Sequence, residues 1–198
     1  MKYIELLEKI NTPIFSIQDL KISNVSILPY QISKLNKDGY LTKVKNGLYI
    51  FSNKKNLISI EHLAFKLYEP SYISLESALF YYGLIPEIIY NVTSISTKAT
   101  RKFKNNFGVF IYRNIKKELF WGYKKEEKNG QVYLIAEPEK ALLDYIYFNI
   151  SKIKNTDDIE GLRLNYSIIK ELDIKKLNEY TALFKNKKIK EIISEIIR

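Results

Sequence analysis

The sequence predicts an α+β protein with two domains, and three observations lead to this expectation. Apolar residues recur at helical spacing three times before Asp38. Two short segments with alternating apolar residues then follow a turn signal. Beyond the polar stretch at residues 52–57, helical and strand-like patterns mix and lead into a helical, charge-rich segment from Asp157 to Arg198. We therefore expect domains at residues 1–54 and 55–198, the second with a small antiparallel sheet and a helical C-terminal tail.

Local signals delimit two short helices at the start of the chain. The apolar pattern of residues 3–10 predicts a helix that ends at Asn11-Thr12-Pro13. Ser16 is a suitable N-cap for a second helix, because its hydroxyl can accept a hydrogen bond from a free amide of the first turn. Ile17, Leu20 and Ile22 are expected to point inward there, and Ser23-Asn24 breaks the helix.

A third helix is expected to begin after Ser26. Pro29 falls in its first turn, where the missing N–H has no intrahelical partner to lose. Gly39 ends the helix as a left-handed cap. The expected inward residues are Leu28, Ile32 and Leu35, and the expected outward residues are Tyr30, Gln31, Lys34 and Lys37.

A hairpin is predicted next, on two short strands joined by Lys45-Asn46-Gly47, because an Asn-Gly pair allows the positive φ angles of a tight turn. Three helices followed by a hairpin is the order of a winged helix-turn-helix, whose third helix enters the major groove of DNA. Gln31 could then pair with adenine, and the lysines could meet phosphates. The predicted DNA-binding residues are Ser26, Tyr30, Gln31, Lys34, Lys37, Lys43, Lys45 and Asn46. The alternative is that these lysines form an ordinary solvated face.

The composition favours a polyanionic partner. The chain has 198 residues and a formal net charge of +10. Residues 1–56 hold nine lysines against four acids, a local charge of +5, and residues 98–128 hold ten basic residues against three acids, a local charge of +7. Lysine is abundant throughout, so the distribution of charge is more informative than its sum.

The second basic region has two parts. One part lies on a turn, "KATRKFKNN", that is expected between the strands "VTSIST" and "FGVFIYRNI", and the other part lies just after the second of these strands. Such a hairpin could lie against a phosphate backbone, of DNA or of RNA. Tyr112, Phe120, Trp121 and Tyr123 could stack on exposed bases, or they could belong to the core. The basic residues of this second patch are Lys98, Arg101, Lys102, Lys104, Arg113, Lys116 and Lys117.

Enzymatic functions find little support in the sequence. There is no cysteine, and His62 is the only histidine, so thiolate or histidine metal sites and histidine-based catalysis have no residues to use. No glycine-rich phosphate loop occurs. Glu137, Glu139 and Asp144 fall on one predicted helix, but acids at a helix start are favoured by its dipole. We expect no catalytic residue, no metal and no cofactor.

The start of the chain lacks a small-residue cleavage site, and no run of about 18 apolar residues could span a bilayer. A cytoplasmic protein is the expectation.

Three blocks of the sequence resemble the AbiEi family of abortive-infection antitoxins, which belong to type IV toxin–antitoxin systems. They are "YISLESALFYYGLIPE", "VTSISTKATRKFKNNFGVFIYRNIKKELFWGY" and "YLIAEPEKALLDYIYF". The family also has an N-terminal winged helix with a "GLY" wing strand, as at Gly47-Leu48-Tyr49. The resemblance covers residues 25–150, and the tail beyond it matches nothing in the family.

This resemblance implies a repressor that binds inverted repeats in its own promoter, with self-association on the DNA. It also implies a C-terminal domain that neutralises a nucleotidyltransferase-like toxin without a stable complex between the two proteins. Two alternatives stay open. One is a regulator without a toxin, whose second domain serves sensing or oligomerisation, and the other is a nucleic-acid-processing enzyme.

Overall fold

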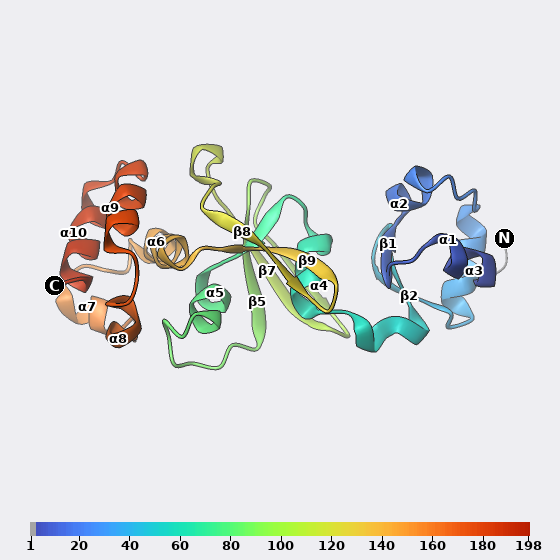
Figure 1. The fold of residues 1–198 in the computed structure, drawn as a ribbon, viewed down its shortest axis with the longest axis horizontal. Coiled ribbons are helices and arrows are strands. Elements are labelled where there is room, and N and C mark those ends of the chain that lie inside the picture. Colours follow the sequence, from blue (N-terminus) through green and yellow to red (C-terminus); the bar gives the residue numbers. More distant parts are fainter. Residues whose placement is uncertain (1–2) are drawn as a thin grey trace. The chain divides into compact units, whose positions relative to one another are not determined.

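The computed structural model describes residues 3–198 and has a mixed α+β architecture (Figure 1). Within these residues the chain forms two compact units. The first contains residues 3–63 and the hairpin tip Lys128–Gln131, and the second contains Ala64–Glu127 and Val132–Arg198. Each unit has its own cluster of buried apolar side chains.

The first unit is built from short helices and a three-stranded antiparallel sheet with the strand order β1-β3-β2. Its core includes Leu6, Phe15, Leu20, Ile32 and Phe51. The elements in chain order are α1 (Tyr3–Lys9), β1 (Ile14–Ser16), α2 (Ile17–Ile22), α3 (Pro29–Lys37), β2 (Leu41–Lys45), β3 (Leu48–Phe51) and the 3-10 helix η1 (Ser52–Leu57).

Two local predictions for this unit were wrong, and one strand was missed. The third helix begins at Pro29, and the preceding Leu28 is its N-cap with 54% of its surface exposed, because residues 23–28 form an irregular turn that keeps Leu28 outside the core. Ile22, expected inward, is 74% exposed at the last position of α2. Strand β1 was not predicted, and it completes the sheet by pairing with β3.

The second unit contains a six-stranded sheet with the order β6-β7-β5-β4-β9-β8. Helix α4 (Ile60–Leu67) spans the division between the units. The elements that follow are β4 (Ser71–Ile73), α5 (Leu75–Tyr81), β5 (Asn91–Ser96), β6 (Arg101–Asn105), β7 (Gly108–Asn114), the 3-10 helix η2 (Lys117–Leu119), β8 (Tyr123–Lys128), β9 (Gln131–Ala136) and α6 (Pro138–Asn149).

The prediction of a small antiparallel sheet was wrong, because this sheet is mixed and larger than expected. β5 runs parallel to β7 and β4 runs parallel to β9, while β4–β5 and β6–β7 are antiparallel. The segment interpreted as a basic turn is therefore a strand, β6, at the edge of the sheet. In the chain β6 lies between β5 and β7, and in the sheet it pairs with β7 at the edge. The strands β5 and β7 are therefore parallel neighbours rather than the two arms of a hairpin.

The helical C-terminal tail is confirmed. It consists of α7 (Thr156–Glu160), α8 (Tyr166–Ile169), α9 (Ile174–Leu183) and α10 (Lys187–Ile196). Helix α6 contacts α5 on one side and α9 and α10 on the other, so it lies between the sheet and the tail (Figure 1). None of the helices in residues 3–198 combines the length and the apolar character needed to cross a bilayer.

Candidate nucleic-acid interface

Local hydrogen bonds and φ angles define the ends of α2 and α3. The Ser16 hydroxyl accepts from the Asp19 amide at 3.1 Å, and the Asp19 carboxylate accepts from the Ser16 amide at 2.7 Å, so the predicted N-cap of α2 is part of a capping box. Asn24 takes a positive φ of 52° just after the end of α2. Gly39, with φ at 80°, ends α3 as predicted.

Helix α3 has one buried side chain and one exposed face. Ile32 is buried and anchors the helix to the core, and Leu35 is half-buried. The helix contains no acidic residue. No salt bridge within residues 3–198 involves Lys34 or Lys37. The exposed residues of the face are Tyr30, Ser33, Lys34 and Lys37, and Ser26 is exposed in the turn before it.

The two side-chain amides of α3 already have internal partners. The Oε1 atom of Gln31 accepts from the Leu28 amide at 2.9 Å, which ties the first turn of the helix. The Oδ1 atom of Asn36 accepts from the Lys43 amide at 2.9 Å and links α3 to β2. Bidentate pairing of Gln31 with adenine needs both its oxygen and its nitrogen. The predicted role of Gln31 would therefore require its cap hydrogen bond to break.

The predicted hairpin is present as β2–β3. Gly47 has a φ of 77°, which only glycine adopts without strain. An irregularity in the strand register lies between Lys43 and Lys45. Lys43 and Asn46 are exposed, and Lys45 is half-buried. The hairpin therefore presents basic and polar side chains at its turn, next in sequence to a basic α3.

The topology of the second unit gathers most of the second basic patch at one end of the sheet. Because β5 and β7 are parallel and β6 is antiparallel to β7, the ends of β5 and β7 lie beside the start of β6. The Asn114 side chain holds these segments together by donating to the carbonyls of Thr97 and Lys98 at 3.2 and 2.9 Å. The residues at this end are Lys98, Arg101, Lys102, Arg113, Lys116 and Lys117, all exposed.

Lys104 is the exception, because it lies three residues along β6 from Arg101, about 10 Å toward the opposite end of the sheet. Aromatic rings support several of the other cations. The Arg101 guanidinium lies 5.6 Å from the Phe103 ring centroid, and the Arg113 guanidinium lies 4.8 Å from that of Phe148. Such contacts hold a cation at the surface without neutralising its charge.

The aromatics of this region belong to the protein interior. Tyr112 is fully buried. Phe120, Trp121 and Tyr123 are partly buried and pack against the main core cluster. The interpretation of these rings as core residues is confirmed for Tyr112, and the ring of Tyr123 stacks on that of Tyr72 at 4.9 Å. These four rings therefore pack against other side chains of the protein.

A fully buried ion pair on α6 was not predicted from the sequence. The Lys140 ammonium contacts the Asp144 carboxylate one turn further along α6, and both side chains have no exposed surface. The Asp144 carboxylate also accepts from the hydroxyls of Tyr72 at 3.0 Å and Ser74 at 2.9 Å. Ser74 is the N-cap residue of α5, but its side chain makes no cap hydrogen bond there, because its hydroxyl is used here. The signal in the sequence was a Lys and an Asp at i,i+4 within an apolar helix.

The two glutamates that resembled an acidic site at the start of α6 are neutralised by a lysine. The Lys176 ammonium lies 3.2 Å from carboxylate oxygens of both Glu137 and Glu139. Burial opposes ionisation of Glu137, but hydrogen bonds from Tyr180 and Lys176 outweigh it and lower the pKa of this carboxyl. Within residues 3–198, no three His, Cys, Asp or Glu side chains gather into a group that could hold a metal ion.

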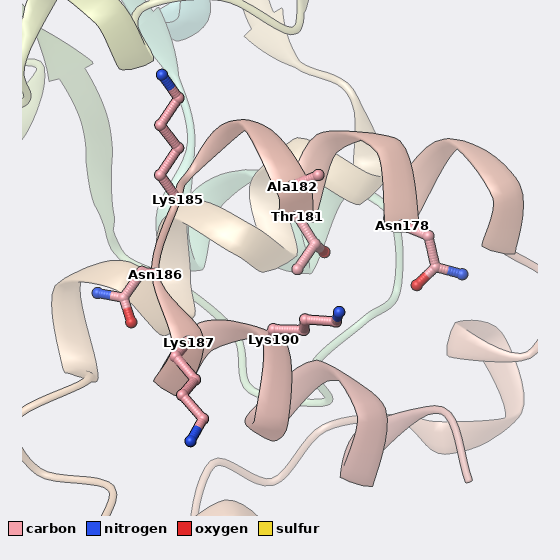
Figure 2. A pocket seen from close by; sticks show the side chains of 7 residues that line it. All are labelled: Asn178, Thr181, Ala182, Lys185, Asn186, Lys187 and Lys190. Atoms are coloured by element: carbon pink, nitrogen blue, oxygen red, sulfur yellow. The ribbon is translucent and has the colours of Figure 1, made fainter.

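A groove between α9 and α10 carries further lysines that the sequence analysis did not single out (Figure 2). Its volume is about 570 Å³, and it is lined by Asn178, Thr181, Ala182, Lys185, Asn186, Lys187 and Lys190. Lys190 extends along the groove beside Thr181, whereas Lys185 and Lys187 extend away from it in opposite directions (Figure 2). Because one cation alone is directed into the groove, we assign no ligand to it.

A comparison with models of known protein families and a comparison with curated proteins find no match to this chain.

Proposed function

We propose that the protein is a DNA-binding transcriptional regulator whose first unit contacts the duplex. The observation that carries this proposal is the exposed face of α3. It presents Lys34 and Lys37 without an acidic residue on the helix, and it precedes a wing that adds Lys43, Lys45 and Asn46. In a winged helix-turn-helix, these are the elements that enter the major groove and follow the phosphate backbone.

More specifically, we propose that it is the antitoxin of a type IV toxin–antitoxin system and represses its own operon. The support is the resemblance to the AbiEi family, whose three blocks fall on β4–α5, β5–β7 and β9–α6. These elements form the main sheet of the second unit and two helices that pack together beside it. Its partners would be promoter DNA with inverted repeats and a nucleotidyltransferase-like toxin that it opposes without catalysis and without a stable complex.

The second basic patch supports a further contact with a phosphate backbone. Six of its seven cations gather at one end of the sheet, and two of them lie over aromatic rings. Each phosphate neutralised by such a cation would add to affinity and to its salt dependence. We include this contact in the proposal, with operator DNA as its ligand.

The test separates DNA binding from toxin neutralisation in the full-length protein. Lys34→Glu with Lys37→Glu should abolish binding to the promoter duplex and relieve repression, while cells that express the toxin remain protected. The control is Lys185→Glu with Lys187→Glu, which makes the same charge change on exposed lysines of the α9–α10 turn and should preserve both activities. Promoter binding that is equal in both double variants would contradict the assignment of α3.

The neighbouring gene discriminates between the two forms of the proposal. A nucleotidyltransferase-like reading frame next to this gene, toxic when expressed alone, is the expected result. If no such gene is present while promoter binding holds, the protein is a regulator whose second unit has another role.

A further inference from the structure

The N-terminal end of α3 carries exposed apolar side chains. Leu28, the N-cap, is 54% exposed, and Tyr30 in the first turn is 66% exposed. Ile22, at the end of the preceding helix α2, is 74% exposed. Single exposed apolar residues need no explanation. Leu28 and Tyr30, however, lie at the start of α3, and the first residues of the corresponding helix contact base edges in helix-turn-helix proteins.

Apart from lysine, the side chains that recognise bases by paired hydrogen bonds are absent from this helix or engaged on it. Arginine, which pairs with guanine, does not occur before Arg101. Glutamine and asparagine pair with adenine, but the acceptor oxygens of Gln31 and Asn36 are held by the amides of Leu28 and Lys43. The exposed positions of α3 hold an aromatic ring, a serine and lysines instead.

One base presents an apolar group in the major groove, and that base is thymine, through its C5 methyl. We propose that Leu28 and Tyr30 read thymine methyl groups, while Lys34 and Lys37 hold the phosphates beside them. This inference rests on the proposed DNA-binding function and names the chemistry that the recognition helix would detect. The operator should accordingly carry A·T pairs beneath the start of α3.

The charge around the apolar tip supports DNA as its occupant. Lys34 and Lys37 follow Tyr30 along the same exposed face, one and two turns further on. A protein partner that covered Leu28 and Tyr30 would also have to neutralise these lysines. A duplex offers the methyl groups and the phosphates together.

The experiment replaces single thymines of the promoter duplex by deoxyuridine, which removes the methyl group and preserves base pairing and the groove hydrogen bonds. Binding of the full-length protein is measured by fluorescence anisotropy at fixed salt. Loss of one buried methyl should weaken binding about fourfold at the positions under α3 and leave the other positions unchanged.

Protein variants then assign the effect to side chains. Leu28→Ala and Tyr30→Ala should each bind more weakly and lose sensitivity to deoxyuridine at one position. Tyr30→Phe keeps the ring and should keep the sensitivity. Lys34→Ala is the matched control on the same face, because it should weaken binding to all sequences while the deoxyuridine effect stays.

Two outcomes would overturn the inference while DNA binding stands. Wild-type affinity that is unchanged by deoxyuridine at every position would show that no methyl is read. Equal deoxyuridine effects in wild type and in the double variant Leu28→Ala/Tyr30→Ala would show that other residues recognise the methyl groups. A change of oligomeric state in that variant would then identify the exposed start of α3 as a self-association surface. Absence of any promoter binding by the wild type would overturn both this inference and the proposed function.

Discussion

Replacing Lys140 by methionine should destabilise the second unit strongly at neutral pH. Methionine keeps most of the apolar stem but removes the charge, so the Asp144 carboxylate stays buried with only the hydroxyls of Tyr72 and Ser74 as partners. Removing one partner of a buried ion pair costs about 3–5 kcal/mol of unfolding free energy. At about 2–4 °C per kcal/mol, the melting temperature should fall by roughly 6–20 °C.

The pH dependence identifies the charge as the cause. Burial already raises the pKa of Asp144, and the nearby Lys140 opposes that shift. Without the lysine the native carboxyl pKa rises further above its value in the unfolded chain. The native state then binds more protons than the unfolded state, so stability is retained at low pH and lost as the pH rises through the native pKa. The difference between variant and wild type should grow by up to about 1.4 kcal/mol per pH unit in that window.

The assay is urea unfolding followed by the fluorescence of Trp121, the single tryptophan of the chain, whose ring lies 5.0 Å from the Lys140 ammonium. Lys66→Met is the control, because Lys66 pairs with Glu69 at 3.0 Å on the surface. That exposed pair should contribute less than about 1 kcal/mol. Equal losses in the two variants, or a loss in Lys140→Met that does not depend on pH, would refute the account of the buried pair.

Three other substitutions test separate parts of the structure. Gln31→Ala should lower the stability of the first unit by about 0.5–1 kcal/mol through its lost cap hydrogen bond, which thermal melts would measure. A loss of operator specificity in titrations without this loss of stability would contradict the capping role. Arg101→Glu with Lys102→Glu should lower the slope of log affinity against log salt by about 2, whereas Lys104→Glu, toward the other end of β6, should leave it nearly unchanged. The pKa of Glu137 is lower in the native state than the ordinary pKa of a glutamate. The ionised carboxylate therefore stabilises the fold above the ordinary pKa, and this stabilisation is lost as the pH falls through the native value. Glu137→Gln should therefore unfold with a weaker acid dependence than wild type, and equal acid dependence would exclude this contribution.

Signals confined to a few neighbouring residues predicted their elements well. Ser16, Gly39 and Gly47 each mark a helix end or a turn whose chemistry is local. Such signals depend on caps and φ angles, which do not require knowledge of distant parts of the chain. The helices and the β2–β3 hairpin of the first unit could therefore be predicted. Leu28 could not be placed, because the exposure of an N-cap residue depends on where the helix begins.

The six-stranded sheet could not be predicted, and its edges show why. The two edge strands, β6 with "RKFKN" and β8 with "YKKEEK", are dominated by charged residues. Charged side chains protect a sheet edge from pairing with other molecules, and they also hide the alternating apolar pattern of a strand. The β6 segment consequently resembled a basic turn, and β8 was not predicted as a strand. The parallel pairing of β5 with β7 is a long-range property that no local pattern encodes.

The lysine-rich composition makes net charge a weak guide to function, and the environment of each lysine separates the roles. Lys140 lies wholly inside the second unit beside Asp144, and Lys176 is shared between Glu137 and Glu139. Both contribute to the charge of +10 without being available to a polyanion. Lys34 and Lys37 have no acidic partner among the described residues and lie on one exposed helix face. A phosphate backbone can displace water and counterions from such lysines without first breaking an internal ion pair, so they are the residues on which affinity for DNA should depend.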